Sequence, residues 1–160
     1  MKCSQILAAV TLVLALALAP GIAAGSGPPK ISKDDRCPVC GMFASKYPDF
    51  VSTVVFKGGG RAFFDGPKDM FKYYQSPGKY NRGKQVSEVE AIYVTDYYGL
   101  RPIDGLKAYY VIGSNVLGPM GKDLVPFERE ADANEFMADH AGKSLLRFEQ
   151  VTPDVIKSLD

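Results

Sequence analysis

Two short apolar segments joined by three glycines constrain the fold of this chain more than any other feature of its sequence. Residues 50–57 read FVSTVVFK and residues 61–65 read RAFFD, and both are rich in β-branched and aromatic side chains. The glycines at 58–60 favour a tight turn, so the pair predicts a β-hairpin with antiparallel strands. A helix is predicted directly afterwards, with Pro67 at its first position, where no backbone N–H is needed.

The same order of elements then occurs a second time. A strong strand is predicted over 89–98, and it completes the first set. The second set consists of strands at 107–113 and 124–128, a helix at 130–142 and a final strand at 144–151. Each half reads strand, strand, helix, strand. The predicted class is therefore α+β, with two ββαβ-type halves and a mainly antiparallel sheet.

Turn and capping residues refine this scheme. Pro126 predicts that the 124–128 strand lies at a sheet edge, because proline has no backbone N–H to donate to a neighbouring strand. Asp132 with Glu135 predicts a capping box for the second helix, and Gly142 predicts its C-cap. Residues 76–84, SPGKYNRGK, are expected to form a loop.

The N-terminus has the pattern of a secretory signal peptide over residues 1–25. Lys2 precedes an apolar run at 6–19, and small residues follow it. The run is short for a membrane span, although an uncleaved N-terminal anchor is the alternative interpretation. Lipidation would need a cysteine at the end of the run, whereas Cys3 precedes it, so membrane tethering by a lipid is not expected.

The remaining chain is expected to be exported, in the periplasm, as one domain over residues 37–151. Residues 26–36 are polar and proline-rich and predict a flexible leader, and residues 152–160 form a C-terminal tail. Loss of the signal peptide would leave only Cys37 and Cys40. In an oxidising compartment two thiols need either a disulfide or a metal ion.

A group of soft ligands suggests which metal this would be. The candidate metal ligands are the thiolates, thioethers and imidazole of Cys37, Cys40, Met42, Met120 and His140. Thiolate and thioether ligands select copper(I), and imidazole is acceptable to it, so Cu(I) is the predicted cofactor. Met120 lies in a glycine-rich loop, LGPMG, where a methionine is more often exposed or recruited than packed in a core.

Other roles for the CPVC sequence stay open. Zinc ranks below copper, because there is no second CxxC and a site of two cysteines, one histidine and a carboxylate would be unusual. A thiol–disulfide oxidoreductase would need a helix after the first cysteine, and Gly41 and Pro48 leave little room for one. A structural disulfide that pins a turn, in a non-catalytic binding module, is the simplest alternative.

His140 also has two interpretations. It shares one face of the predicted helix with Ala133, Phe136 and Met137, which is the pattern of a histidine in a packed core. Its position in the last helical turn favours the protonated form, which opposes metal binding. A soft metal ion would have to displace that proton.

Charge and motifs exclude several functional classes. The formal net charge is +1 and the basic residues are scattered, so no nucleic-acid partner is expected. Neither a nucleophile–base pair nor a glycine-rich phosphate loop is readable, so the chain is not expected to be an enzyme.

Several sequences in order, from Asp34 to Val151, resemble the NosL family. They are CPVCGM, FFDGPKDMFKYY, AIYVTDYYG, AYYVIGS, LGPMG and ADANEFMADHAG. The family comprises exported copper(I)-binding proteins that help to assemble the copper centres of nitrous oxide reductase. The resemblance implies two ββαβ halves and copper ligands at Cys37 or Cys40, Met120 and His140.

The resemblance implies a function and shows two departures from the family pattern. It implies a copper(I) metallochaperone that passes copper by ligand exchange to a copper-accepting cuproenzyme or its assembly machinery, with nitrous oxide reductase as the expected acceptor. Many relatives are lipoproteins, and this chain lacks the expected lipid-accepting cysteine. The family helix usually ends His-Gly-Gly, whereas this one ends His-Ala-Gly at 140–142.

Overall fold

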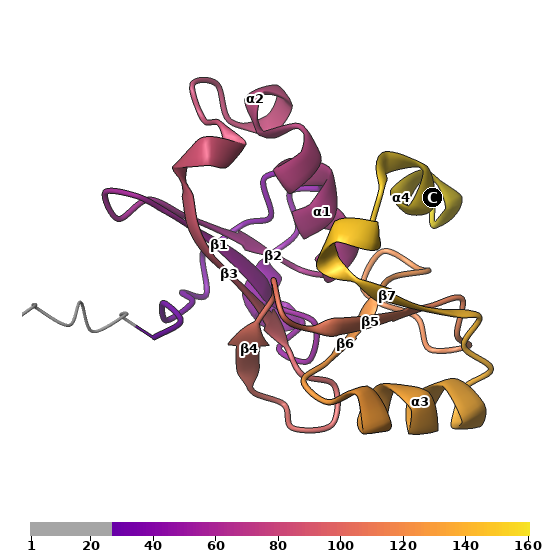
Figure 1. Cartoon of the computed structure of the whole chain (residues 1–160). Helices are drawn as coiled ribbons and strands as arrows, with labels where there is room; N and C mark the ends of the chain where they lie inside the picture. The colour runs from indigo at the N-terminus through magenta and orange to yellow at the C-terminus, as the bar shows by residue number, and fades with distance from the viewer. Residues whose placement is uncertain (1–26) are drawn as a thin grey trace, which may run out of the picture.

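The computed structural model describes residues 27–160 (Figure 1). The predicted signal peptide and Cys3 lie outside the described residues. Within residues 27–160, no helix is both long enough and apolar enough to cross a membrane.

The first half forms a four-stranded antiparallel sheet with a helix packed on it. Its elements are β1 (Ser52–Phe56), β2 (Arg61–Phe64), α1 (Pro67–Gln75), β3 (Val89–Thr95) and β4 (Pro102–Asp104). The strand order is β2-β1-β3-β4, and every neighbouring pair is antiparallel. The predicted hairpin is confirmed. Gly58 and Gly59 both have positive φ in its turn, where a side chain would be strained.

The second half repeats this arrangement with a three-stranded sheet. Its elements are β5 (Tyr109–Ile112), β6 (Val125–Phe127), α3 (Glu130–Asp139) and β7 (Ser144–Arg147). The order β6-β5-β7 corresponds to β2-β1-β3, and β6 lies at an edge, as Pro126 predicted. The expected α+β class with two ββαβ halves is confirmed.

The second sheet separates two hydrophobic cores, because neighbouring residues of a strand point to opposite faces. Tyr110 packs edge-to-face against Phe71 of α1, with ring centroids 5.2 Å apart, and belongs to the larger core. Val111, the next residue of β5, belongs to a smaller core with Phe136 of α3. In Figure 1, α1 lies above the second sheet and α3 lies below it.

The segment after β7 adds a cover for α1. Helix α4 (Pro153–Ser158) is N-capped by Thr152, whose side chain accepts a hydrogen bond from the Val155 N–H. Ile156 and Leu159 are buried in the larger core, so the predicted tail contains a packed helix. Helix α1 therefore has protein on both sides.

Two local predictions were wrong. Residues 76–84 contain a short helix, α2 (Pro77–Tyr80), with Pro77 at its first position. Helix α3 begins at Glu130 and has no side-chain cap, so the predicted capping box does not form. Asp132 lies inside the first turn, where it accepts a hydrogen bond from Arg129 at 2.7 Å instead of capping the helix.

The C-terminal end of α3 also differs from expectation. Gly142 was predicted to end the helix, but the residue in the left-handed conformation is Ala141, with φ of 53°. The Gly142 N–H closes the end by donating to the Met137 carbonyl at 3.0 Å. Strand β4 was not predicted, because three residues that include a proline carry too little alternation to read.

Candidate metal centre

Residues 37–42 form a closed turn, which we call the cysteine turn. The Gly41 N–H donates to the Cys37 carbonyl, and the Cys37 N–H donates to the Met42 carbonyl, both at 2.8 Å. Gly41 has φ of 81°, which favours glycine strongly. The turn brings both cysteines and Met42 onto one short, hydrogen-bonded segment.

The residues on either side hold the cysteine turn in place. Arg36 and Phe43 form an isolated antiparallel bridge across its base. The Arg36 guanidinium lies 3.7 Å from the centre of the Phe43 ring and donates to the Gly41 carbonyl at 3.0 Å. This contact combines a cation–π interaction with a hydrogen bond, so the turn is restrained before any ion binds.

The turn packs against two carboxylates from the first half. Asp65 follows β2 directly, and Asp69 lies in the first turn of α1. The Cys37 thiol donates to Asp69 Oδ2 at 3.4 Å, and the Cys40 thiol donates to Asp65 Oδ1 at 3.2 Å. One ligand atom from each of the four residues lies within 4.8 Å of the others. We call this group the cysteine–aspartate cluster.

Burial keeps both thiols protonated near neutral pH. It raises the pKa of Cys37 well above the usual range and that of Cys40 to about 11, and the neighbouring carboxylates add to both shifts. Both cysteines are free thiols, so the structural disulfide is not formed. An ion that binds both as thiolates must displace two protons.

Met120 lies at the tip of a second tight turn. Gly118 and Gly121 exchange two backbone hydrogen bonds, of 2.7 and 3.1 Å, around Pro119 and Met120. The Met120 residue is 46 % exposed, as its glycine-rich surroundings suggested. Its carbonyl accepts a hydrogen bond at 3.0 Å from the ammonium of Lys68, the residue before Asp69. The Met120 turn is therefore fastened to the helix that carries part of the cluster.

Asp123 holds the segment that carries Met120 against the start of α1. Its Oδ1 accepts hydrogen bonds from the backbone N–H groups of Lys68 at 2.7 Å and Leu124 at 2.8 Å. A Cβ at Gly66 would overlap Asp123 Oδ2, and one at Gly118 would come within 2.6 Å of it. These glycines let the Met120 turn and the start of α1 approach closely. Burial raises the pKa of Asp123 to about 7.

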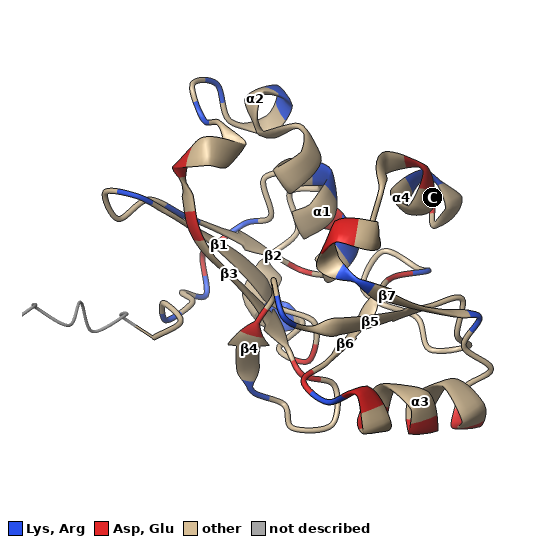
Figure 2. Ribbon diagram, in the orientation of Figure 1, with Lys and Arg blue, Asp and Glu red and all other residues tan. Residues whose placement is uncertain are grey.

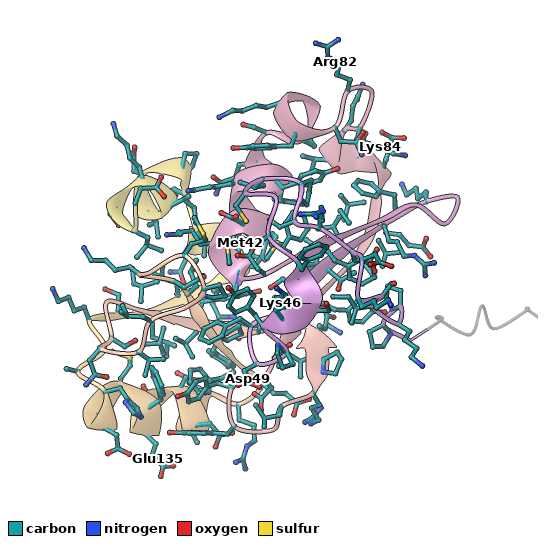
Figure 3. The ribbon with its side chains drawn as sticks, turned by 180° about the vertical axis from the view of Figure 1, so that it is seen from behind. Met42, Lys46, Asp49, Arg82, Lys84 and Glu135 are labelled. Carbon is teal, nitrogen blue, oxygen red and sulfur yellow. The ribbon has the colours of Figure 1, made fainter. Side chains whose placement is uncertain are left out.

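The other methionines divide as expected between core and surface. Met42 is partly exposed at the end of the cysteine turn, and Figure 3 shows it in front of α1 in the view from behind. Met70 is fully buried in the larger core. Met137 is partly buried and packs against the smaller core, where a role as a copper ligand would not be expected.

His140 lies apart from the four clustered residues. Its Nδ1 is 3.2 Å from Asn115 Oδ1, and its ring centroid is 4.4 Å from that of Phe136. The group of metal-binding side chains found within residues 27–160 does not include it. Figure 3 shows Glu135 of α3, the helix that His140 follows, at the opposite end of the molecule from Arg82 and Lys84. His140 is nonetheless joined to the connection that carries Met120, because Asn115 precedes Met120 in that segment.

Sequence reasoning missed Asp65 and Asp69. Both occur in FFDGPKDM, which was read only as a strand end and a helix start. Their burial was the missing information, because an aspartate at the start of a helix is usually a solvated first-turn residue. The signal was the pair of carboxylates four residues apart around Gly66 and Pro67.

Comparisons with known proteins agree with this arrangement. The NosL family model matches residues 28–156. The copper-binding lipoprotein NosL of Stutzerimonas stutzeri is 30 % identical over 125 residues, which cover 73 % of this chain and 62 % of that protein. This chain therefore matches less than two thirds of that relative's length.

A solved structure supports the fold as well. The crystal structure of the copper chaperone NosL from Shewanella denitrificans superposes with a TM-score of 0.67 at 25 % identity, covering 79 % of this chain and 96 % of that one. Both relatives are named as binding or carrier proteins and not as enzymes, as expected for this chain. The match over residues 28–156 includes the cysteine turn, the Met120 turn and both ββαβ halves, and the chain belongs to the NosL family.

Proposed function

We propose that this protein is an exported copper(I) metallochaperone that carries copper to a cuproenzyme or its assembly machinery, with nitrous oxide reductase as the expected acceptor. One observation carries the proposal: Cys37 and Cys40 are free cysteines whose sulfur atoms lie within 4.8 Å of each other on a restrained turn. Sulfur ligands of this kind select the cuprous ion. The chain's similarity to a copper-binding lipoprotein and to a copper chaperone supports the proposal.

The proposed ligands differ in how accessible they are. Cys37 is buried, Cys40 and Met42 are partly exposed, and Met120 is the most exposed of the sulfur ligands. A cuprous ion needs only two to four soft ligands, so the two thiolates with one or two thioethers suffice. Lys68 keeps the Met120 turn against α1, and in this proposal the exposed thioether at the tip moves toward the cysteines when copper binds.

This gradient suits transfer by ligand exchange. An acceptor would first replace the exposed thioether of Met120 and then the thiolate of Cys40. Cys37 would release copper last, because its thiolate is the most deeply enclosed. The returning protons have ready partners, since each thiol donates to a carboxylate in the metal-free protein.

We include His140 as an outer ligand. Its Nδ1 faces Asn115, which would leave Nε2 for copper. The backbone N–H of Asn115 also donates to the His140 carbonyl at 2.9 Å, so the imidazole and the Met120 connection form one unit. In this proposal the histidine receives copper when that unit moves toward the cysteine turn.

The proposed location is the periplasm. The N-terminal pattern of residues 1–25 supports export, and the Stutzerimonas relative is named a lipoprotein. We do not propose a lipid anchor on Cys3, because it precedes the apolar run.

The raised thiol pKa values argue against a thiol–disulfide oxidoreductase. A CxxC enzyme depends on a cysteine whose pKa is lowered by a helix N-terminus or a cation. Here the burial of Cys37 and Cys40 and the two nearby carboxylates act in the opposite direction. The thiols are weak nucleophiles until a metal ion displaces their protons.

The test is competition for copper(I) against a chromophoric chelator, with the protein purified from an exporting host and kept reduced. Replacing both Cys37 and Cys40 by serine should weaken binding more than about a thousandfold, or about 4 kcal/mol. Met137→Leu is the matched control, because it removes a core methionine and should leave the affinity unchanged. Equal affinity in the serine variant and the wild type would refute the proposal.

A further inference from the structure

We propose that the cysteine–aspartate cluster also binds a divalent ion of the zinc type, through two thiolates and two carboxylates. The site would use Cys37 and Cys40 together with Asp65 and Asp69. It shares its cysteines with the proposed copper(I) site, but it replaces the thioethers by oxygen ligands. This inference does not depend on copper binding.

The spacing of the four ligand atoms fits a tetrahedral ion after a small contraction. Zinc bonds of about 2.3 Å to sulfur and 2.0 Å to oxygen place neighbouring ligand atoms about 3.3–3.8 Å apart. The two thiol–carboxylate pairs are already 3.4 and 3.2 Å apart, and all four atoms lie within 4.8 Å of one another. Ligand atoms at the 4.8 Å limit would have to move together by about 1 Å to reach the tetrahedral spacing.

Asp65 gives an independent indication that a ligand belongs here. The residue is completely buried, and its Oδ2 has no hydrogen-bond partner among the described residues. An unpaired carboxylate oxygen in the interior is costly, and such groups normally coordinate an ion or receive a hydrogen bond. A divalent ion between Asp65 and the cysteines would satisfy it.

Charge favours a divalent ion in this arrangement. Two thiolates and two carboxylates carry four negative charges, and a divalent ion neutralises half of them where a cuprous ion neutralises a quarter. Among residues 27–160, Asp69 has an ion pair with the Lys72 ammonium, 4.0 Å from its Oδ1. Carboxylates also suit harder ions than copper(I), so Asp65 and Asp69 add nothing for the cuprous ion.

The two ions would exclude each other, because both need Cys37 and Cys40. A divalent ion would hold the thiolates against oxidation while no copper is present. Copper(I) would then displace it by binding the sulfurs more strongly and by recruiting Met42 or Met120. Asp65 and Asp69 would leave the departing ion in that exchange and would not coordinate copper(I).

Cobalt(II) is the probe for this site, with the reduced wild-type protein. Tetrahedral coordination with sulfur gives strong visible d–d bands and a sulfur-to-cobalt charge-transfer band in the near ultraviolet. Zinc X-ray absorption on the same wild-type protein should give two sulfur and two oxygen neighbours. This second measurement needs no variant, so it stands even where a substitution disturbs folding.

Asp65→Asn and Asp69→Asn test the oxygen ligands. Each should weaken cobalt(II) and zinc(II) binding at least about tenfold without weakening copper(I) binding, because loss of a carboxylate that raises the thiol pKa values makes the thiols easier to deprotonate. Asp34→Asn is the matched control, since it removes an exposed carboxylate close to the cysteine turn without touching the cluster. It should leave both affinities unchanged.

Two results would overturn the inference. One is octahedral cobalt(II) without a sulfur charge-transfer band, and the other is cobalt(II) binding that both asparagine variants retain in full. Either would leave the copper(I) proposal standing, because that proposal is judged by the serine variants. The opposite outcome is also informative. If the wild-type protein binds copper(I) no better than the serine variant but shows two sulfur and two oxygen neighbours around zinc, this site is supported and the copper chaperone is refuted.

Discussion

The two halves of the molecule share one strand order, but their helices are placed very differently. Six of the nine residues of α1 are buried, compared with two of the ten residues of α3. The cysteine turn and α4 cover α1, whereas α3 lies on the surface and its outward side carries acidic residues (Figure 2). The candidate metal centre lies where segments outside the repeat meet the helix of the first half.

This difference shows how a repeated scaffold acquires a site. A ββαβ unit buries one face of its helix against its own sheet, and the other face is left for solvent or for added chain. In the second half that face is solvated. In the first half it is covered, so Asp69 and Lys68 are enclosed and must find partners in the cysteine turn and the Met120 turn.

The largest expected effect concerns Asp123, which supports the covered helix. Its pKa is about 7 when folded and about 4 when unfolded, so the native state holds more protons between these values. The stability that this group contributes is complete below about pH 4 and is lost as pH rises through about 7, by at most about 4 kcal/mol.

The variant Asp123→Asn isolates this contribution. Asn Oδ1 can accept the same two N–H bonds and cannot ionise, so the variant should gain stability relative to the wild type as pH rises. Urea unfolding at pH 4, 5.5 and 7.5 measures the difference. If the difference in free energy of unfolding between the variant and the wild type does not grow with pH, the raised pKa of Asp123 is contradicted.

The two helix starts offer the next test. Gly66 precedes α1 and Arg129 precedes α3 at the equivalent position. Gly66→Ala would force its Cβ onto Asp123 and should cost about 2–3 kcal/mol. Arg129→Ala should change stability far less, because Arg129 is exposed and its ion pair with Asp132 is confined to the surface helix. If thermal unfolding shows equal losses of stability in the two variants, the start of α1 is no more tightly packed than the start of α3.

His140→Gln asks whether the second half takes part in copper binding at all. Loss of an outer ligand should weaken copper(I) by up to about tenfold, or about 1.4 kcal/mol, far less than the cysteine changes. Chelator competition measures this, and a melting curve of the metal-free variant provides the comparison. Unchanged affinity with a lower melting temperature would make His140 a structural residue and confine the site to the first half.

The smallest effect is expected at the end of α3. Ala141 adopts a left-handed conformation that glycine adopts without strain, so Ala141→Gly should stabilise the protein by about 1 kcal/mol. Ala138→Gly, three residues earlier in the helix, should destabilise it by about the same amount. If both variants gain stability or both lose it, backbone strain at Ala141 does not limit the stability of the helix end.

The strand order was predictable because it rests on local patterns. The FVSTVVFK and RAFFD segments with their glycines determined the hairpin, and Pro67 and Pro126 marked a helix start and an edge strand. Helix α2 and strand β4 were missed because each has only three or four residues, too few for a periodic pattern. The capping box failed because Arg129 provides a competing partner for Asp132.

Of the cysteine–aspartate cluster, only the two cysteines were predictable from the sequence, because the spacing in CPVC indicates a metal or redox role. Met42, Met120 and His140 stay predicted ligands. Asp65 and Asp69 were not predictable, since aspartate is common at strand ends and in first helical turns. Only the tertiary packing of the cysteine turn on α1 makes them buried neighbours of the thiols.

Copper X-ray absorption on the copper-loaded, reduced wild-type protein tests whether sulfur ligands hold copper(I). We expect the edge shape of copper(I) and a first shell of two or three sulfur atoms, from Cys37, Cys40 and the thioether of Met42 or Met120. The shell should lose its short sulfur neighbours in the protein with both cysteines replaced by serine. A copper(II) edge, or a shell of nitrogen and oxygen atoms alone in the wild type, would refute copper(I) binding by the cysteine turn.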